Sequence, residues 1–403
     1  MLIHQKPMAV ANKMDNLRAA VIGIGNMGSA HASCIARGEV GGLELVAVCD
    51  INADKINFFT SLYPDVKKYF DYKELIKSDI IDCDIIATPH PSHAEIAICA
   101  LENGINVMLE KPADISISKV SKLGEIAEKS GKVFGIMFNQ RTNPLYRKAK
   151  EIVHSGDLGE IIRSVWIITN WFRTQSYYDS GNWRATWSGE GGGVLLNQAP
   201  HNLDLWQWIC GMPESITAFC EVGKYHNIEV EDDVTIFAKY KNGATGTFIT
   251  STGEFPGTNR LEITGDKGKL VIENQTLKWW KLKNSISETR EKDSRTFASI
   301  DYDYEEIIVS GEGGHKEMLE NFANAVLNGE ELIADGYCGI NELAISNAAY
   351  LSSWNNNIEI KLPFDYNEFD EKLSELQSVS KKSDINEDYD ISSHYNDRWK
   401  VKW

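Results

Sequence analysis

The chain has 403 residues, which predicts two domains, and its 42% of hydrophobic residues is enough to build their cores. The 41 basic and 58 acidic residues give a net charge of −17, which argues against nucleic acid and anionic membranes as partners, because both need a basic face. The seven cysteines contain no CxxC pair, so neither a disulfide framework nor a zinc cluster is expected. No signal peptide and no apolar run of about 18 residues is found, so we expect a cytoplasmic protein.

Short apolar runs alternate with amphipathic helical patterns in the first third of the chain. The runs that are typical of strands buried on both faces are 18–23, 43–50, 82–88, 106–111 and 132–138. Helical patterns lie between them at 93–104 and 118–131, and the second ends at Gly131, a typical helix C-cap. This alternation predicts a parallel sheet that is wrapped by helices.

The pattern changes after about Asn139. Strand-like runs, joined in part by the turn signals KNG and GDKG, occupy 161–173, 232–240, 244–251, 259–265 and 269–274. Helices are expected near 144–155, 314–329 and 341–354, and an amphipathic helix followed by loose chain is expected beyond Pro363. We interpret the last four of these runs as antiparallel hairpins, so the second part is predicted to be an α+β domain around a mostly antiparallel sheet.

The stretch VIGIGNMG has the G-x-G-x-x-G spacing at the end of the first strand, with Gly23, Gly25 and Gly28. Asn26 and Met27 lie inside the motif, and a helix is expected to begin near Met27. In this motif the first glycine allows a tight turn, the second lets a pyrophosphate approach the backbone, and the third permits close helix–strand packing. The free N–H groups and the positive dipole end of the helix favour phosphate binding.

Asp50 ends the second strand, where a carboxylate accepts hydrogen bonds from the adenosine ribose hydroxyls of a dinucleotide. The same charge repels a 2′-phosphate, and the following residues, INA, offer no arginine to bind one. NAD(H) is therefore favoured over NADP(H), against the alternative that Asp50 is only a polar strand end.

The stretch ATPHPSH follows the third of these strands at the edge where this fold binds ligands. His90 and His93 have a spacing that metal ligands can have, but no third ligand is in view. We therefore interpret Thr88, His90 and His93 as loop and helix-cap residues near the cofactor, and no metal is expected.

Glu110, Lys111 and Pro112 end the next strand, again on the cofactor side. Most lysines are solvated surface residues, but burial and the positive nicotinamide ring would both lower the pKa of a lysine in this crevice. Pro112 would fix the backbone so that Lys111 points inward, through a cis bond if the peptide adopts one.

The segment GGGVLLNQAPHNLDLWQWICG has apolar residues at helical spacing up to Gly211. On one helix, Asn197, His201 and Asp204 would share a face. Removal of a hydride from a carbinol also requires removal of the hydroxyl proton, and histidine suits that task. The segment alone favours a core histidine held by Asp204, whereas the nearby cofactor site favours a proton carrier.

The motifs GIGNMG, EKP and GGGVLL…PHNLD, in this order, resemble the glucose–fructose oxidoreductase / inositol dehydrogenase (Gfo/Idh/MocA) family from Arg18 to about Pro363. The resemblance implies an α/β Rossmann domain followed by an α+β domain with a large open, mostly antiparallel sheet. We place an N-terminal arm at 1–16, the dinucleotide-binding domain at 17–138, the substrate-binding and oligomerisation domain at 139–365, and an acidic tail at 366–403.

By the same resemblance, Lys111 and His201 are the catalytic residues. The dehydrogenases of this family commonly carry Asp where this chain has Asn197, so proton transfer falls on His201, with Lys111 tuning the hydroxyl and Asn197 orienting it. This version of the motif resembles a branch that contains sugar and glycoside dehydrogenases, some of which act at C3 of glucosides.

Aromatic and arginine side chains in WFRTQSYYDSGNWRATW suit a sugar, because C–H faces pack on aromatic rings and arginines donate to hydroxyls. The alternative is that these aromatics fill the sheet core or an oligomer interface. The candidate substrate-binding residues are Trp171, Arg173, Tyr178, Trp183, Arg184, Asn197 and His201, with Asn139 and Arg141 added by resemblance.

The leading hypothesis is a dehydrogenase that transfers a hydride from a ring carbon, most simply C3, of a pyranoside, sugar or cyclitol to NAD. A second hypothesis is an NAD-recycling glycosidase that oxidises C3 transiently and eliminates the aglycone. A third, of another class, is a non-catalytic NAD-sensing regulator. The alternating residues of the second sheet also predict a homo-oligomer, because its open face needs a cover.

Overall fold

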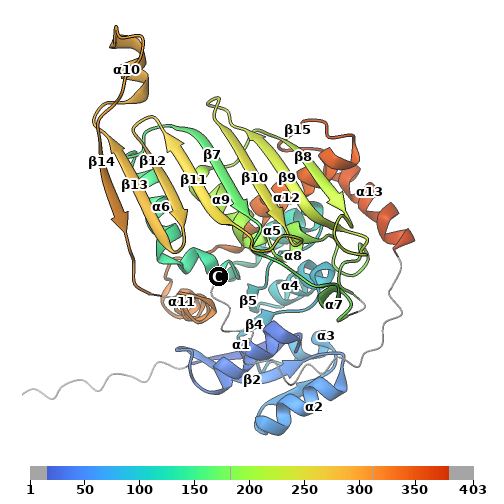
Figure 1. Ribbon diagram of the computed structural model, residues 1–403. Helices are drawn as coiled ribbons and strands as arrows, with labels where there is room; N and C mark the ends of the chain where they lie inside the picture. Colours follow the sequence, from blue (N-terminus) through green and yellow to red (C-terminus); the bar gives the residue numbers. More distant parts are fainter. Residues whose placement is uncertain (1–15, 182, 312, 381–403) are drawn as a thin grey trace, which may run out of the picture.

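The computed structural model describes residues 16–181, 183–311 and 313–380, which form two sheets with their helices (Figure 1). The expected arm at 1–16 and the part of the tail beyond Ser380 therefore lie almost wholly outside the described residues. Among the described residues, no helix is both long and apolar enough to cross a bilayer.

The first sheet is parallel, with strand order β3-β2-β1-β4-β5-β6. Its strands are β1 (Leu17–Ile22), β2 (Leu43–Cys49), β3 (Lys67–Tyr69), β4 (Cys83–Ile86), β5 (Asn106–Leu109) and β6 (Phe134–Ile136). Its helices are α1 (Asn26–Ala36), α2 (Ala53–Leu62), α3 (Tyr72–Ile76), η1 (His90–Ser92), α4 (His93–Glu102) and α5 (Ile117–Ser130). The five predicted strands and the parallel sheet are confirmed, and the short edge strand β3 was not predicted.

The buried pattern explains these elements. All four residues of β4 are buried, as expected for a strand that helices cover on both faces. Helix α5 buries Ile117, Val120, Leu123 and Ala127 on one face, and it ends at Gly131 in the left-handed conformation, with φ +62°. The predicted C-cap is therefore confirmed.

The second sheet has the order β14-β13-β12-β11-β7-β10-β9-β8-β15. Its strands are β7 (Ile161–Ile168), β8 (Ser215–Val222), β9 (Glu231–Lys239), β10 (Thr245–Ser251), β11 (Asn259–Gly265), β12 (Gly268–Glu273), β13 (Thr276–Leu282), β14 (Tyr302–Ile307) and β15 (Ile360–Lys361). The hairpins β9–β10 and β11–β12 are antiparallel as predicted, but β7 and β10 pair in parallel. The predicted mostly antiparallel sheet is therefore confirmed, and the parallel pairing of β7 with β10 was not predicted.

Helices cover one face of this sheet, with α6, α9 and α12 behind it in Figure 1. The remaining helices of the chain are η2 (Asn139–Thr142), α6 (Pro144–His154), α7 (Gln175–Tyr178), α8 (Val194–Asn197), α9 (Pro200–Cys210), α10 (Ile286–Lys292), α11 (His315–Asn328), η3 (Gly336–Cys338), α12 (Gly339–Trp354) and α13 (Tyr366–Val379). In β9 the side chains of Val234, Ile236 and Ala238 are fully buried toward the helices, whereas Phe237 is 40% exposed on the other face. This alternation leaves the outer face of the sheet uncovered in the single chain.

Candidate functional site

The glycine loop between β1 and α1 lies at the carboxyl edge of the parallel sheet. Gly23 has φ +93°, and a Cβ atom there would lie 2.6 Å from the Ala87 carbonyl oxygen. A Cβ at Gly28 would lie 1.7 Å from the Gly23 carbonyl oxygen, whereas one at Gly25 would have no heavy atom within 4 Å. Positions 23 and 28 therefore require glycine for packing, and the open space at Gly25 fits a pyrophosphate against the start of α1.

Asp50 lies beside this loop at the end of β2. Its Oδ2 accepts a hydrogen bond of 2.7 Å from the Ile24 N–H, and its Oδ1 accepts one of 2.8 Å from the Asn52 N–H. The carboxylate thus also holds the loop backbone, which a polar strand end alone would not require. Asn26 and Met27 are the first two residues of α1, half-buried next to the open space.

Thr88, His90 and His93 follow β4 at the same edge. The His93 ring nitrogens each lie 2.7 Å from a carbonyl oxygen, of Pro112 and of Thr88, and His90 Nδ1 lies 3.2 Å from the Glu190 carbonyl oxygen. Both histidine rings therefore hold neighbouring loops together through contacts with backbone carbonyl groups. Among the described residues, no group of three or more His, Cys, Asp or Glu side chains is arranged to hold a metal ion.

Glu110, which follows β5, is a buried carboxylate that contacts α1. Its Oε1 lies 2.7 Å from His31 Nε2, and its Oε2 accepts a hydrogen bond of 3.2 Å from the Lys111 N–H. Burial would raise the pKa of Glu110, but the hydrogen bond and charge of His31 outweigh it and lower this pKa to about 2. Sequence reasoning missed His31, which is 79 positions away.

Lys111 connects the first sheet to the second half of the chain. It lies at the carboxyl edge of the parallel sheet, where β1, β2, β4 and β5 end, which we call the cofactor edge. Its Nζ donates a hydrogen bond of 2.8 Å to the backbone carbonyl of Asn197, and its peptide bond to Pro112 is cis. Burial lowers the pKa of Lys111, and the carboxylates of Glu110, Glu342 and Glu190 oppose this shift.

The segment from Gly191 to Gly211 folds into two helices, not one. α8 ends at Asn197 and α9 begins at Pro200, a residue that suits the first turn of a helix because it has no N–H to satisfy. The prediction that Asn197 and His201 share a face of one helix is therefore wrong. Glu231 of β9 holds the start of α8, because its carboxylate accepts hydrogen bonds of 2.9 Å from the Gly193 and Leu195 N–H groups.

His201 is the second residue of α9, and its ring centroid lies 6.4 Å from that of Phe138. Its Nδ1 is buried and has no hydrogen-bond partner among the described residues. Burial, together with the nearby charge of Lys111, lowers the pKa of His201 well below the usual value, so the ring is neutral and able to accept a proton.

Asp204 does not hold His201. Its carboxylate forms a buried two-point ion pair with Arg141, at 2.6 and 2.8 Å, and also accepts a hydrogen bond of 3.0 Å from Gln207. The interpretation of His201 as a core histidine held by Asp204 is therefore wrong. Arg141, only 3% exposed, uses its guanidinium in this ion pair, and its role in substrate binding stays a prediction.

Arg173, Trp183 and Arg184 lie around Tyr177. The Arg184 guanidinium lies 4.5 Å from the Trp183 ring centroid and 4.7 Å from that of Tyr177, and Arg173 lies 5.0 Å from the Tyr177 centroid. The Tyr177 hydroxyl accepts hydrogen bonds from Arg184, at 3.0 Å, and from Gln198, at 3.2 Å. Since His90 and Trp183 have ring centroids 6.3 Å apart, this aromatic–arginine cluster adjoins the cofactor edge.

The other substrate-side candidates are buried. Tyr178 is 6% exposed and its hydroxyl lies 2.7 Å from Thr252 Oγ1, while Trp171 is 8% exposed. Asn139, 5% exposed, has a buried Oδ1 with no hydrogen-bond partner among the described residues, which is the kind of acceptor that a ligand hydroxyl or amide satisfies.

Two buried carboxylates near Lys111 were missed by sequence reasoning. Glu190 precedes the glycine triplet and accepts a hydrogen bond from the Asn197 side-chain amide. Glu342 of α12 is fully buried with neither oxygen partnered among the described residues, and burial raises its pKa well above the usual value. For Glu190, the acidic residue beside three glycines in GEGGG was the available signal; for Glu342 there was none.

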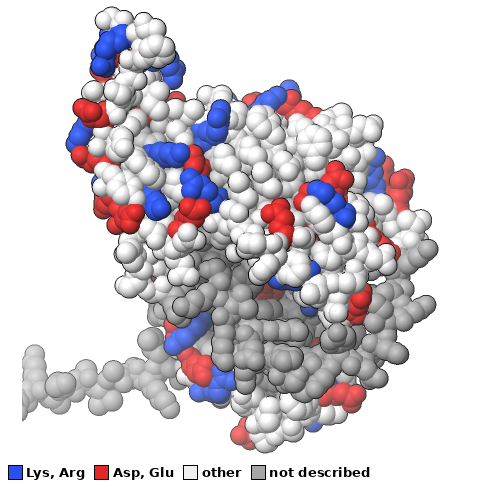
Figure 2. All heavy atoms as spheres, viewed as in Figure 1, with Lys and Arg blue, Asp and Glu red and all other residues white. Residues whose placement is uncertain are grey.

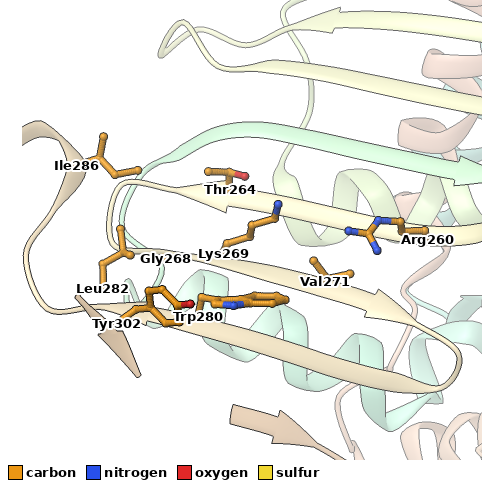
Figure 3. A pocket seen from close by; sticks show the side chains of 9 residues that line it. All are labelled: Arg260, Thr264, Gly268, Lys269, Val271, Trp280, Leu282, Ile286 and Tyr302. Carbon is orange, nitrogen blue, oxygen red and sulfur yellow. The ribbon is translucent and has the colours of Figure 1, made fainter. Parts of the chain in front are cut away.

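A separate hollow of about 450 Å³ lies on the second sheet (Figure 3), and neither Lys111 nor His201 lines it. Its walls come from strands β11 to β14 and from the first residue of α10. The residues that line it are Arg260, Thr264, Gly268, Lys269, Val271, Trp280, Leu282, Ile286 and Tyr302.

Comparison with known families matches both parts of the chain. Residues 17–138 match the oxidoreductase family with an NAD-binding Rossmann fold, and residues 146–271 match the GFO/IDH/MocA C-terminal domain. A myo-inositol 2-dehydrogenase from Thermotoga maritima is 25% identical over 64% of this chain and 75% of its own. The NAD⁺-dependent scyllo-inositol 2-dehydrogenase of Bacillus subtilis is 26% identical over 64% of this chain and 73% of its own.

Solved structures share the fold. The WlbA dehydrogenase from Chromobacterium violaceum, in complex with NADH and UDP-GlcNAcA, superposes with a TM-score of 0.75 at 25% identity and covers 91% of this chain and 100% of its own. A levoglucosan dehydrogenase in complex with NADH and levoglucosan superposes with a TM-score of 0.71 at 20% identity, over 87% and 100% of the two chains. The predicted fold class and the NAD-binding domain are thus confirmed.

Proposed function

We propose, from the premise that this chain belongs to the GFO/IDH/MocA oxidoreductase family, that it oxidises one ring hydroxyl of a pyranoside, sugar or cyclitol, at C3 in a pyranoside. One observation carries the proposal: Lys111 Nζ, at the end of the nucleotide-binding sheet, donates a hydrogen bond of 2.8 Å to Asn197, three residues before α9 and its His201. This contact joins the end of the nucleotide-binding sheet to the residues just before α9, which supports a single site for the cofactor and for proton transfer.

In the proposed reaction the carbinol loses a hydride from carbon and a proton from oxygen, and a C=O bond forms. Bound NAD⁺ supplies the acceptor for the hydride. His201 takes the hydroxyl proton, since its lowered pKa keeps the ring neutral before the reaction. Lys111 has two further N–H groups to stabilise the developing charge on the hydroxyl oxygen, and Asn197 orients that hydroxyl.

The proposed substrate site continues from these groups to the aromatic–arginine cluster of Arg173, Tyr177, Trp183 and Arg184. An aromatic face with arginine donors suits a ring that has C–H faces and hydroxyl edges. The inositol dehydrogenases among the relatives, and the dehydrogenase whose complex contains UDP-GlcNAcA, support a cyclitol or sugar as substrate.

A panel of glucosides, free sugars and inositols mixed with the purified protein and NAD⁺ tests the proposal. NADH absorbance is followed while products are analysed, and binding of NAD⁺ is measured separately. Steady NADH formation with a keto product is the expected result. Aglycone release without net NADH would instead indicate the recycling glycosidase, and cofactor binding with no turnover would indicate the regulator.

We further propose that the chain forms a homo-oligomer through the open face of the second sheet. In Figure 2, basic and acidic side chains are interspersed over the part formed by β11–β14, where Arg260 bonds to Glu262 and Glu273. The outer face of β8–β10 is more apolar, with Phe219 49% and Phe237 40% exposed. We expect light scattering to give at least a dimer, and Phe237→Glu to reduce it to a monomer.

The remaining proposals concern location and partners. All seven cysteines are free thiols, which supports the expected reducing cytoplasm. The net charge of −17 supports a small-molecule substrate over nucleic acid or an anionic membrane.

A further inference from the structure

Glu190 is a buried carboxylate to which the proposed reaction assigns no task. It is 1% exposed, and both of its oxygens accept hydrogen bonds: Oε1 from the Asn197 side-chain amide, and Oε2 from the Ala185 N–H at 2.7 Å. Its backbone carbonyl lies 3.2 Å from His90 Nδ1. The residue therefore lies between the cofactor edge and the end of α8.

The contact with Glu190 decides which way the Asn197 amide points. A side-chain amide has a donor end and an acceptor end, and a carboxylate can only accept, so Nδ2 must face Glu190. Oδ1 then points away from Glu190. The backbone carbonyl of the same residue is held by Lys111 Nζ at 2.8 Å, so Asn197 is fixed from both sides.

Cations and hydrogen-bond donors surround the Glu190 carboxyl. Burial raises the pKa of Glu190 above its usual value, and the positive charges of Arg184 and Lys111, the Ala185 N–H and the Asn197 amide limit this rise without reversing it. The buried carboxylate thus has two hydrogen-bond donors and two nearby cations, which is what a buried charge requires.

We propose that Glu190 is a positioning residue that makes Asn197 present its acceptor oxygen, and not its amide N–H, to the ring hydroxyl next to the reacting one. This inference rests on the proposed function. An acceptor at that point receives the hydrogen of the neighbouring hydroxyl and so fixes the ring, which leaves the reacting hydroxyl with its lone pairs toward Lys111 and its single hydrogen toward His201. Glu190 acts through Asn197 and touches no reacting atom.

Glu190→Gln separates this task from simple support of the loop. The new glutamine keeps the size of Glu190, and its oxygen can still accept from the Ala185 N–H. Its amide nitrogen then faces Asn197, which must turn its Oδ1 toward it and present Nδ2 to the substrate. The loop stays in place while the hydrogen bond offered to the substrate is inverted.

Asn197→Asp in the Glu190→Gln background restores the acceptor. The new aspartate accepts from the glutamine amide with one oxygen and presents the other to the substrate. Asn197→Asp alone places two buried carboxylates in contact, which is unfavourable unless they share a proton. The double variant is therefore expected to work better than either single one.

The experiment compares wild type, Glu190→Gln, Asn197→Asp and the double variant, with the substrate that the panel identifies. Asp266→Asn serves as a control, since Asp266 also accepts a backbone N–H, from Ser287 at 2.8 Å, but on the second sheet near β11. We expect Glu190→Gln to lower kcat by about 10- to 100-fold with unchanged NAD⁺ affinity, and the double variant to recover most of that loss. Full activity of Glu190→Gln, or a double variant no better than Glu190→Gln, would overturn the inference.

A second readout needs no substrate. In Asn197→Asp, the paired carboxylates hold a proton that the unfolded chain releases, so thermal stability relative to wild type should fall with rising pH above about 5, and the double variant should lack this additional fall. A missing fall would overturn the contact itself. A wild-type protein that binds NAD⁺ but turns over nothing, with this fall present, would contradict the proposed function and not the contact.

Discussion

The cofactor edge and the segment 183–201 are built in different ways. At the cofactor edge the ends of β1, β2, β4 and β5 meet, and the ligand space is formed by backbone next to Gly25. The segment 183–201 has little regular structure and is held by side chains from distant elements. The carboxylate of Glu231 holds α8, and Gln377 of α13 donates a hydrogen bond of 3.2 Å to the Trp187 carbonyl.

This difference has a consequence for mutation. Backbone geometry at the cofactor edge is fixed by the sheet, so substitutions there should act by filling the space that the cofactor is expected to occupy. In the segment 183–201, the orientation of side chains depends on individual hydrogen bonds, so changes there should act through the placement of the groups that we propose to be catalytic.

His201→Ala tests the chemical part of the second region. Removal of a general base typically costs about 10²- to 10⁴-fold in rate, and we expect a loss of kcat in that range. NAD⁺ affinity should be unchanged, because His201 is not among the residues that we expect to bind the cofactor, such as Gly25 and Asp50. The exposed His154 of α6 offers a matched control, and His154→Ala should keep full activity. Equal kcat in the two variants would remove His201 from the reaction.

Gly25→Ala and Gly28→Ala test the first region as a pair. Since a Cβ at Gly25 meets nothing, this variant should keep its thermal midpoint but bind NAD⁺ about tenfold or more weakly, because the methyl group occupies ligand space. A Cβ at Gly28 would collide with the Gly23 carbonyl, so that variant should lose stability as well. Calorimetry and scanning fluorimetry separate the two, and normal NAD⁺ binding by Gly25→Ala would contradict the placement of the pyrophosphate.

Asp84 on β4 tests the first region further. Its carboxyl group lies inside the parallel sheet, where a change should alter stability. It is fully buried, neither oxygen has a partner among the described residues, and burial raises its pKa to about 8. Between pH of about 4 and 8 the unfolded chain releases this proton and the folded chain keeps it. The free energy of unfolding should therefore fall by roughly 1 kcal/mol per pH unit as pH rises, through Asp84.

Urea unfolding of wild type and Asp84→Asn at pH 5, 6, 7 and 8 measures this contribution. The difference between the proteins isolates Asp84 from other titrating groups, and the variant should gain stability relative to wild type as pH rises. Parallel pH profiles would mean that Asp84 is ionised or partnered in the folded chain.

Ser380→Ala tests the distant support of the second region, and we expect the smallest effect. The Ser380 hydroxyl accepts a hydrogen bond of 3.2 Å from the Ser188 N–H and donates one of 2.6 Å to Glu229. Loss of these two hydrogen bonds should cost about 1 kcal/mol of stability. It should also raise KM more than it lowers kcat, because Ser188 lies in the segment 183–201, which contains part of the proposed substrate site. Ser378→Ala, which removes only a bond to Glu375 within α13, is the control.

The same contrast explains how far the sequence could predict the molecule. The glycine loop, Asp50 and Lys111 were predicted because each lies at the end of a strand, and strand ends of a parallel sheet meet at one edge. Glu231 and Gly193 are 38 positions apart, and Arg141 and Asp204 are 63 apart, so no local spacing relates them. Pro200 is a signal for a helix start, but the apolar periodicity continues across it and by itself indicates one helix.

The most direct measurement of the central claim follows the hydride itself. The substrate identified by the panel is labelled with deuterium at the ring carbon that bears the oxidised hydroxyl, and the reduced cofactor is analysed by mass spectrometry after one turnover. The account predicts one deuterium in the reduced nicotinamide, with a much slower transfer in His201→Ala. A reduced cofactor without deuterium, or transfer at the same rate in His201→Ala, would contradict it.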